Sequence, residues 1–214
     1  MNFRYYNSSN LVILILILIF LISPLSACIE KKISEYEDLN ILYGYVGIFS
    51  TVTILTGVLL LIDRFLWRFS LFNWLIDVPN LNGRYEGELT SSFIDPSTNL
   101  PTVKKCVMEI SQNASKICVH SYYGDIATNN QTSQGFSLSE EIVKNNNGIF
   151  EVFYIFSNTP NALINQLHHH LGTSNLKYFP DIKVLEGEYF NQRGLKGTIK
   201  VSFVQKETVG RFII

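Results

Sequence analysis

Two long apolar stretches dominate the first third of the chain. No charged residue occurs within residues 5–29 or within residues 41–62. A bilayer core about 30 Å thick requires about 20 helical residues, so both stretches are long enough to cross it. Within lipid the backbone must satisfy its own hydrogen bonds, and neither stretch has the polar face of a soluble helix. We therefore predict transmembrane helices at about residues 8–28 and 41–62, within a membrane region that covers residues 1–64.

The hydrophobic pattern changes after Pro79. Short runs rich in Val, Ile, Phe, Tyr and Thr alternate there with turn clusters such as Asp95-Pro96-Ser97 and Asn145-Asn146-Asn147-Gly148, which is typical of short β-strands. The pattern predicts eight strands: Asn82–Phe93, Thr102–Ser111, Lys116–Tyr123, Gly135–Val143, Ile149–Ser157, roughly His169–Lys177, Ile182–Asn191 and Leu195–Gln205.

Alternation of apolar and polar residues is clearest in the last strand. Its apolar residues Ile199, Val201 and Phe203 share one face, and Lys196 and Lys200 lie on the other. Such alternation requires one buried and one solvated face. Only residues 161–167 resemble a helix in this part of the chain. Eight short antiparallel strands without helices must pair as a sandwich or close as a barrel.

Glycines within the predicted strands favour the barrel. Glu86-Gly87-Glu88-Leu89 in the first strand recurs as Glu186-Gly187-Glu188-Tyr189 in the seventh, and Gly197 lies within the last. A glycine inside a strand usually marks a bulge, a sharp bend or a close approach of two backbones. A sandwich with glycines at its turns stays open as the alternative.

The predicted fold is therefore two transmembrane α-helices plus an all-β domain. That domain is an eight-stranded antiparallel up-and-down β-barrel, lipocalin-like but small, which covers residues 80–206. A juxtamembrane linker, residues 65–79, precedes it and is rich in aromatic residues, as is common at a membrane surface. Residues 207–214 form a C-terminal tail.

The distribution of basic residues predicts the topology. Hydrophobic residues make up 47% of the chain and charged residues only 16%. The loop of residues 30–40 is net acidic, whereas Arg4 precedes the first predicted span and Arg64 and Arg68 follow the second. Because basic residues favour the cytoplasmic side, we expect a multi-pass membrane protein with its N-terminus and its barrel in the cytoplasm.

The first apolar stretch has a second interpretation. Leu25-Ser26-Ala27-Cys28 is similar to a bacterial lipobox, in which a signal sequence is removed and the cysteine is lipidated. A full second span follows twelve residues later, which would make a lipid anchor redundant. The membrane-helix interpretation is therefore preferred, and lipidation of Cys28 stays open.

The two glycine motifs and the architecture together resemble a known family. Leu-Asn-Gly-Arg-Tyr-Glu-Gly-Glu-Leu (81–89) follows the predicted helices, and Leu-Glu-Gly-Glu-Tyr-Phe-Asn-Gln-Arg-Gly (185–194) comes about a hundred residues later. The chain resembles the bacterial anti-phage CBASS effectors that join two membrane helices to a β-barrel, the SMODS-associated 2TM β-strand-rich family of CD-NTase-associated proteins. The resemblance covers nearly the whole chain.

This resemblance implies a function. A partner nucleotidyltransferase makes a cyclic oligonucleotide, most simply a cyclic dinucleotide, and the barrel binds it as an activating ligand. The effector then forms a homo-oligomer, contacts membrane lipid and disrupts the inner membrane, which kills the infected cell. The other function considered is a membrane-tethered lipocalin-like carrier of a small apolar ligand, which would need a hollow apolar cup.

The chemistry of a cyclic dinucleotide suggests which residues bind it. Its bases stack on aromatic rings, and its phosphates require Arg, Lys or backbone N–H groups. Six tyrosines are candidate platforms, although packing in the core or at the rim is the more common role for any one of them. Arg84 and Arg193 lie in or beside the glycine motifs. We predict a ligand-binding site made of Arg193, Arg84, Tyr85, Tyr189, Asn191, Tyr122 and Tyr154.

Other chemistry is not expected from this sequence. Three consecutive histidines, residues 168–170, cannot easily ligate one ion together, so no metal site is predicted. No nucleophile motif is present, so we predict neither an enzyme nor a cofactor. Residues 80–206 carry nearly equal numbers of basic and acidic side chains, so duplex nucleic acid is not an expected partner.

Overall fold

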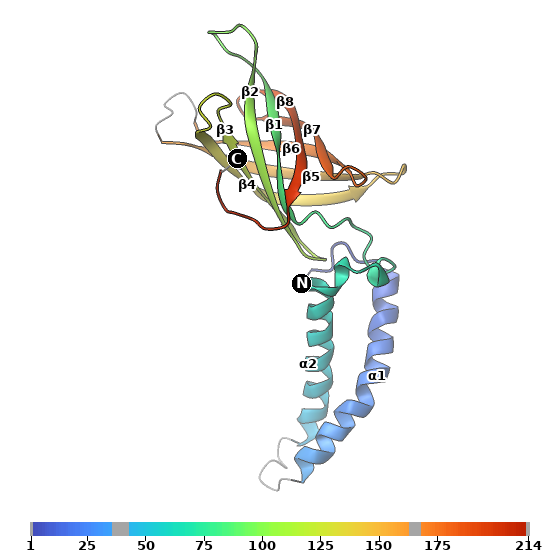
Figure 1. The fold of residues 1–214 in the computed structure, drawn as a ribbon. Coiled ribbons are helices and arrows are strands. Elements are labelled where there is room, and N and C mark those ends of the chain that lie inside the picture. The colour runs from blue at the N-terminus through green and yellow to red at the C-terminus, as the bar shows by residue number, and fades with distance from the viewer. Residues whose placement is uncertain (1, 36–42, 163–167, 213–214) are drawn as a thin grey trace. The chain divides into compact units, whose positions relative to one another are not determined.

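The computed structural model describes residues 2–35, 43–162 and 168–212. The chain forms two compact units: residues 1–77 with 113–115, and residues 78–112 with 116–214. Helices α1 (Ser8–Ser34) and α2 (Tyr43–Arg64) belong to the first unit, and eight strands form the second (Figure 1).

One described segment, Ser8–Ile29 of α1, is long and apolar enough to cross a membrane. The prediction of a first apolar helix at residues 8–28 agrees with this segment. The second predicted span, residues 41–62, begins outside the described residues, so its role as a span stays a prediction, although α2 is helical as expected.

Polar contacts connect parts of the helical unit. The Thr51 hydroxyl donates a hydrogen bond of 2.7 Å to the Ser26 hydroxyl, which joins α2 to α1. The backbone N–H of Asn7 donates to the carbonyl of Leu75 at 2.8 Å, and Tyr6 pairs with Ile76 in an antiparallel bridge. The chain before α1 therefore lies beside the segment that leads into the barrel.

Short turns form the segment that follows α2. Two 3-10 helices, η2 (Leu66–Arg68) and η3 (Ser70–Phe72), occupy the predicted aromatic linker. Trp67 is buried in this unit, whereas Phe69 and Trp74 are exposed, and the position of this segment at a membrane surface stays a prediction.

The second unit is a closed barrel in which each strand pairs antiparallel with the next, and β8 pairs with β1 (Figure 1). This confirms the predicted eight-stranded up-and-down barrel and excludes the sandwich. The suggested helix at residues 161–167 lies mostly outside the described residues. The strands are β1 (Gly83–Ile94), β2 (Pro101–Gln112), β3 (Ile117–Gly124), β4 (Gln131–Lys144), β5 (Phe150–Pro160), β6 (His170–Phe179), β7 (Val184–Asn191) and β8 (Lys196–Gln205).

Glycines within the strands allow the neighbouring backbones to approach closely. A Cβ atom at Gly87 would lie 2.1 Å from the carbonyl oxygen of Lys200, and one at Gly197 would lie 2.0 Å from that of Thr90. A Cβ atom at Gly187 would meet the carbonyl oxygen of Asn175 at 1.9 Å. These overlaps explain in steric terms why glycine occupies the bends of this small barrel.

One end of the barrel interior is filled by side chains. Strand alternation directs Tyr85, Met108, Leu176 and Leu185 inward, and each is 1% exposed or less. The Tyr85 hydroxyl donates to the Leu81 carbonyl at 3.1 Å, so its polar atom is satisfied within this packing. The opposite end of the barrel interior is hollow.

The C-terminal tail covers part of the outer wall. Glu109 of β2 accepts hydrogen bonds from the backbone N–H groups of Val209 (2.7 Å) and Gly210 (3.0 Å). The Arg84 guanidinium donates to the Arg211 carbonyl at 3.0 Å. These contacts bury polar groups on the outside of β1 and β2, where a barrel wall would ordinarily face water.

Candidate functional site

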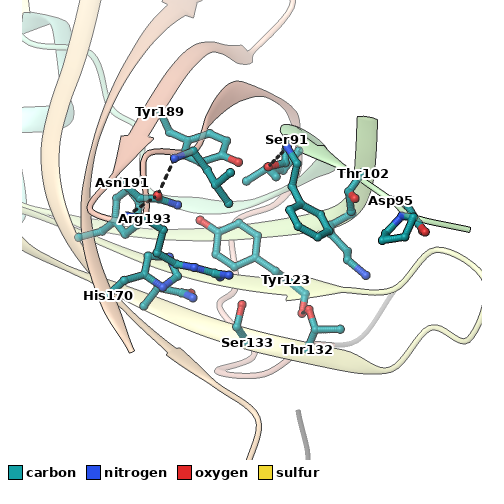
Figure 2. A pocket seen from close by; sticks show the side chains of 17 residues that line it. Ser91, Asp95, Thr102, Tyr123, Thr132, Ser133, His170, Tyr189, Asn191 and Arg193 are labelled. Atoms are coloured by element: carbon teal, nitrogen blue, oxygen red, sulfur yellow. Dashed lines mark hydrogen bonds between the residues drawn. The ribbon is translucent and has the colours of Figure 1, made fainter. Parts of the chain in front are cut away.

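A cavity of about 410 Å³ opens at the hollow end of the barrel. This volume falls within the range of small-molecule sites, about 300–1,000 Å³. Every strand except β8 contributes at least one lining residue, and Figure 2 shows the side chains around the cavity. The lining comprises Leu89, Ser91, Phe93, Asp95, Pro96, Thr102, Lys104, Tyr123, Thr132, Ser133, Phe156, Asn158, His170, Tyr189, Asn191, Arg193 and Leu195.

The turn between β7 and β8 positions Arg193. Asn191 accepts hydrogen bonds on its side-chain oxygen from the backbone N–H groups of Arg193 (3.0 Å) and Leu195 (3.2 Å). Gly194 closes the turn with φ +74°, a conformation that favours glycine. The Asn191 side chain therefore orders the turn that carries the arginine.

The Arg193 side chain extends over the cavity, beside His170 and Tyr123 (Figure 2). Its guanidinium makes no hydrogen bond or ion pair with any described residue, although its backbone is bonded within the turn. A guanidinium without a carboxylate partner retains all of its donors for an anionic ligand.

Aromatic rings line the cavity walls. Tyr123 of β3 and Tyr189 of β7 are 9% and 6% exposed, and Phe156 of β5 lies on the same inner face. Burial raises the pKa of both tyrosine phenols, so they stay protonated at neutral pH. Neutral rings of this kind provide surfaces on which a base can stack.

A second cation lies at the rim. The Lys104 ammonium forms an ion pair of 3.0 Å with Asp125, and both side chains are partly exposed. Hydrogen bonds from Ser97 lower the pKa of the Asp95 carboxyl, which keeps this exposed rim group ionised. The rim is therefore mixed in charge, and Arg193 is the cation that the described contacts leave available.

Two buried polar atoms on the lining have no hydrogen-bond partner among the described residues. They are Asn158 Oδ1 on β5 and Thr102 Oγ1 on β2. A buried acceptor without a partner costs about 1–3 kcal/mol, which a ligand that donates a hydrogen bond would recover. These atoms therefore mark where donor groups would be recognised.

The structure gathers three of the seven predicted site residues at the cavity. Arg193, Asn191 and Tyr189 line it, and all three come from the β7 end of the second glycine motif. Tyr154 faces inward on β5 but is buried below the cavity. Tyr85 packs in the filled end of the barrel.

The other two predicted site residues lie on the outer wall. Arg84 forms ion pairs with Glu86 (2.6 Å) and Glu109 (2.8 Å). Tyr122 is buried next to that pair, and Glu109 contributes to raising the pKa of its phenol, after burial. Arg84 and Tyr122 occupy the outward-facing positions of β1 and β3, whose neighbours Tyr85 and Tyr123 face inward.

Sequence reasoning did not select Asn158 or His170. Each lies on the inward face of its strand, in series with Tyr154 and Phe156 for Asn158 and with Ser174 and Leu176 for His170. A polar residue at an inward position of an otherwise apolar strand face is the signal that would have identified Asn158, whereas the inward face of β6 also carries Ser174 and offers no such contrast for His170. Reading that signal requires knowing which face of the strand is inward.

No group of three or more His, Cys, Asp or Glu side chains that could hold a metal ion occurs within the described ranges. The polar groups at the cavity are instead a guanidinium and amide, hydroxyl and imidazole groups, and the guanidinium of Arg193 suits an organic anion.

Comparison with known proteins gives two matches. Residues 76–202 match the family model of the Cap15 cyclic dinucleotide receptor domain. The chain is also similar to CD-NTase-associated protein 15 of Yersinia aleksiciae, with 24% identity over 147 residues, which cover 67% of this chain. The match spans 64% of the length of that relative. The family match includes all eight strands except the last three residues of β8.

Proposed function

Because the chain belongs to the Cap15 cyclic dinucleotide receptor family, we propose that it is the effector of a bacterial anti-phage CBASS system and that its barrel binds a cyclic dinucleotide. The observation that carries the proposal is the cavity at the hollow end, where Arg193 extends over aromatic walls. A partner nucleotidyltransferase would supply the ligand.

The lining suits the two chemical parts of such a ligand. Arg193 offers a planar set of donors that matches a phosphate, and Lys104 adds a second positive charge at the rim. Tyr123, Tyr189 and Phe156 offer rings for the bases. The inward-facing residues below the cavity are already packed, so the ligand would bind at the mouth rather than deep in the barrel.

The helices would anchor the receptor in the inner membrane. The apolar segment Ser8–Ile29 supports an anchor, and the second span, the homo-oligomer and the damage to membrane lipid are parts of the proposal. The pairing of Tyr6 with Ile76 supports the same side of the membrane for the N-terminus and for the start of the barrel. The basic residues Arg4, Arg64 and Arg68 favour the cytoplasmic side.

Calorimetry on the full-length protein in detergent tests this function. Wild-type protein should bind at least one member of a panel of cyclic dinucleotides in one set of sites, and linear dinucleotides of the same bases should bind more weakly. If the folded protein binds no cyclic dinucleotide and no cyclic trinucleotide, the proposal is wrong.

The carrier of a small apolar ligand is the other candidate. Its cup would be lined by satisfied or apolar side chains. The cavity instead contains the available guanidinium of Arg193 and the buried, unpartnered oxygen of Asn158. An apolar cargo would leave both groups desolvated, which costs free energy, so the lining favours a polar anionic ligand.

A further inference from the structure

Asn158 and His170 lie opposite one another on neighbouring strands of the cavity wall. They are Cα partners in the β5–β6 ladder, and both line the cavity. Their side chains are 4% and 7% exposed. Directly opposed residues on one sheet face have Cβ atoms about 4.5–5.5 Å apart, so the two side chains start from neighbouring points of the cavity wall.

Asn158 presents a free acceptor to the cavity. Its Oδ1 atom is buried and has no hydrogen-bond partner among the described residues, and the structure gives its amide nitrogen none within the described ranges. A buried carboxamide with no partner is rare in folded proteins, because amide groups lose water on burial and must recover the hydrogen bonds elsewhere.

His170 presents a second acceptor. Its Nδ1 atom lies 2.8 Å from the carbonyl oxygen of His168, which can only accept, so Nδ1 carries the proton. Burial lowers the pKa of the imidazole more than the hydrogen bond with the His168 carbonyl raises it, and Arg193 and His169 lower it further. The ring is therefore neutral at pH 7, and its Nε2 atom has a lone pair. No described residue donates a hydrogen bond to that atom.

We propose that the paired acceptors of Asn158 and His170 recognise the exocyclic amino group of a base in the cyclic dinucleotide; this rests on the proposed function. An amino group carries two hydrogens that diverge from one nitrogen, so it can donate to two neighbouring acceptors at once. A ribose hydroxyl carries a single hydrogen, so it cannot donate to both acceptors at once, and the ionised phosphates carry none. Adenine, guanine and cytosine carry such an amino group, whereas hypoxanthine and uracil do not.

The amide nitrogen of Asn158 adds direction to this recognition. In adenine and cytosine a ring nitrogen that accepts hydrogen bonds neighbours the amino group, and a single carboxamide can pair with both atoms. Asparagine reads adenine in this bidentate way in protein–DNA complexes. Arg193 lies beside His170 in Figure 2, so a phosphate on the guanidinium and a base on the acceptor pair could belong to the same ligand.

The test compares ligands that differ at one group. Full-length protein in detergent is titrated by calorimetry with the cyclic dinucleotides of adenine, guanine and hypoxanthine, and with those of cytosine and uracil. At least one amino-bearing ligand should bind about tenfold or more tightly than the amino-free ligand with the same kind of base, purine or pyrimidine. The reason is that a base without an amino group leaves the buried acceptors unpaired.

Variants assign the discrimination to residues. The quantity compared is the ratio of the affinities for the amino-bearing and the amino-free ligand. Asn158→Leu, of similar size but without an acceptor, should reduce this ratio to near one. His170→Gln should preserve most of it because glutamine retains an acceptor. Asn175→Leu on the outer face of β6 makes the same change outside the cavity and should leave the ratio unchanged. If Asn158→Leu fails to fold, the wild-type ratio and His170→Leu decide the question.

The outcomes separate the inference from the function beneath it. If the wild-type protein binds cyclic dinucleotides but does not distinguish amino-bearing from amino-free bases, the two acceptors bind water and not the ligand, and the inference is wrong. If it binds none of them, the proposed function is wrong. If the affinity ratio between amino-bearing and amino-free ligands stays unchanged in both Asn158→Leu and His170→Leu, other residues of the cavity recognise the base, and the inference is also wrong.

Discussion

Arg84 and Glu109 form an ion pair of 2.8 Å on the outer wall of the barrel, with side chains 3% and 5% exposed. Glu109 also accepts two backbone hydrogen bonds from the C-terminal tail, and Arg84 donates to a carbonyl of that tail. The pair thus joins two strands and the end of the chain. Its position explains why the arginine of the first glycine motif does not line the cavity.

Loss of one partner from this pair should destabilise the barrel. Arg84→Ala leaves Glu109 buried without its counter-ion, which costs about 3–5 kcal/mol in comparable sites. Thermal unfolding should show a lower melting temperature, while Lys200→Ala, which breaks the exposed pair with Glu186, should change stability by less than about 1 kcal/mol. Equal effects of the two substitutions would mean that the buried ion pair contributes no more to stability than the exposed one.

Arg193→Ala should weaken ligand binding without unfolding the protein. Hydrogen bonds to charged groups contribute about 1.5–3 kcal/mol, so the Kd should rise by roughly ten- to a hundred-and-fifty-fold. Calorimetry on the full chain measures this change. Lys196→Ala removes an exposed cation from the outer face of β8 and serves as the matched control. An unchanged Kd for Arg193→Ala would exclude phosphate contact by this side chain.

The strands could be predicted from the sequence because their signals are local. Alternation and turn residues such as those at Asn145–Gly148 depend on neighbours along the chain, and the glycine motifs added the sharp bends of a closed barrel. The strand ends were less certain. β4 begins at Gln131 instead of Gly135, because pairing with β3 and β5 extends it beyond its own apolar pattern.

The site could be predicted only in part because its geometry depends on register. Arg193 and Asn191 lie in a turn at the cavity mouth, and turn residues are recognisable in sequence. Arg84 and Tyr122 differ from Tyr85 and Tyr123 by a single position, and that position decides whether a side chain faces outward or inward. Two of the partners of Arg84, Glu109 and the Arg211 carbonyl, are 25 and 127 residues away, so no local pattern could reveal them.

Steric need for glycine within the strands can be tested by a matched pair of substitutions. Gly87→Ala places a Cβ atom 2.1 Å from a backbone oxygen of β8, whereas Gly135→Ala meets its nearest backbone oxygen at 3.4 Å. Forced overlap in a packed structure costs about 1–3 kcal/mol or more, so Gly87→Ala should lower the melting temperature clearly more than Gly135→Ala. Similar melting temperatures would show that β1 and β8 can separate without cost.

His170 should make stability depend on pH. Its pKa in the folded protein lies below the usual value, mainly because of burial. In the unfolded chain the imidazole has its usual pKa of about 6.5. At pH values between this pKa and the lower pKa of the folded protein, the unfolded chain binds more protons than the folded one. The free energy of unfolding therefore falls as the pH drops below about 6.5. Melting curves from pH 8 to pH 5 should show this loss in wild-type protein and less of it in His170→Gln.

Deletion of the helices should separate binding from cell death. On the proposed function, the barrel detects the ligand and the helical unit damages the membrane. Two helices cannot enclose a sizeable channel, so damage requires several subunits, and ligand-driven contact between barrels would raise the local concentration of helices.

Removal of residues 1–64 should therefore abolish toxicity in cells that produce the ligand, while the purified remainder still binds it if it folds. Arg193→Ala in the full chain should reduce toxicity through weaker binding, with the helices intact. A chain without helices that still kills cells in response to the ligand would contradict the membrane mechanism and indicate that the barrel acts on another target.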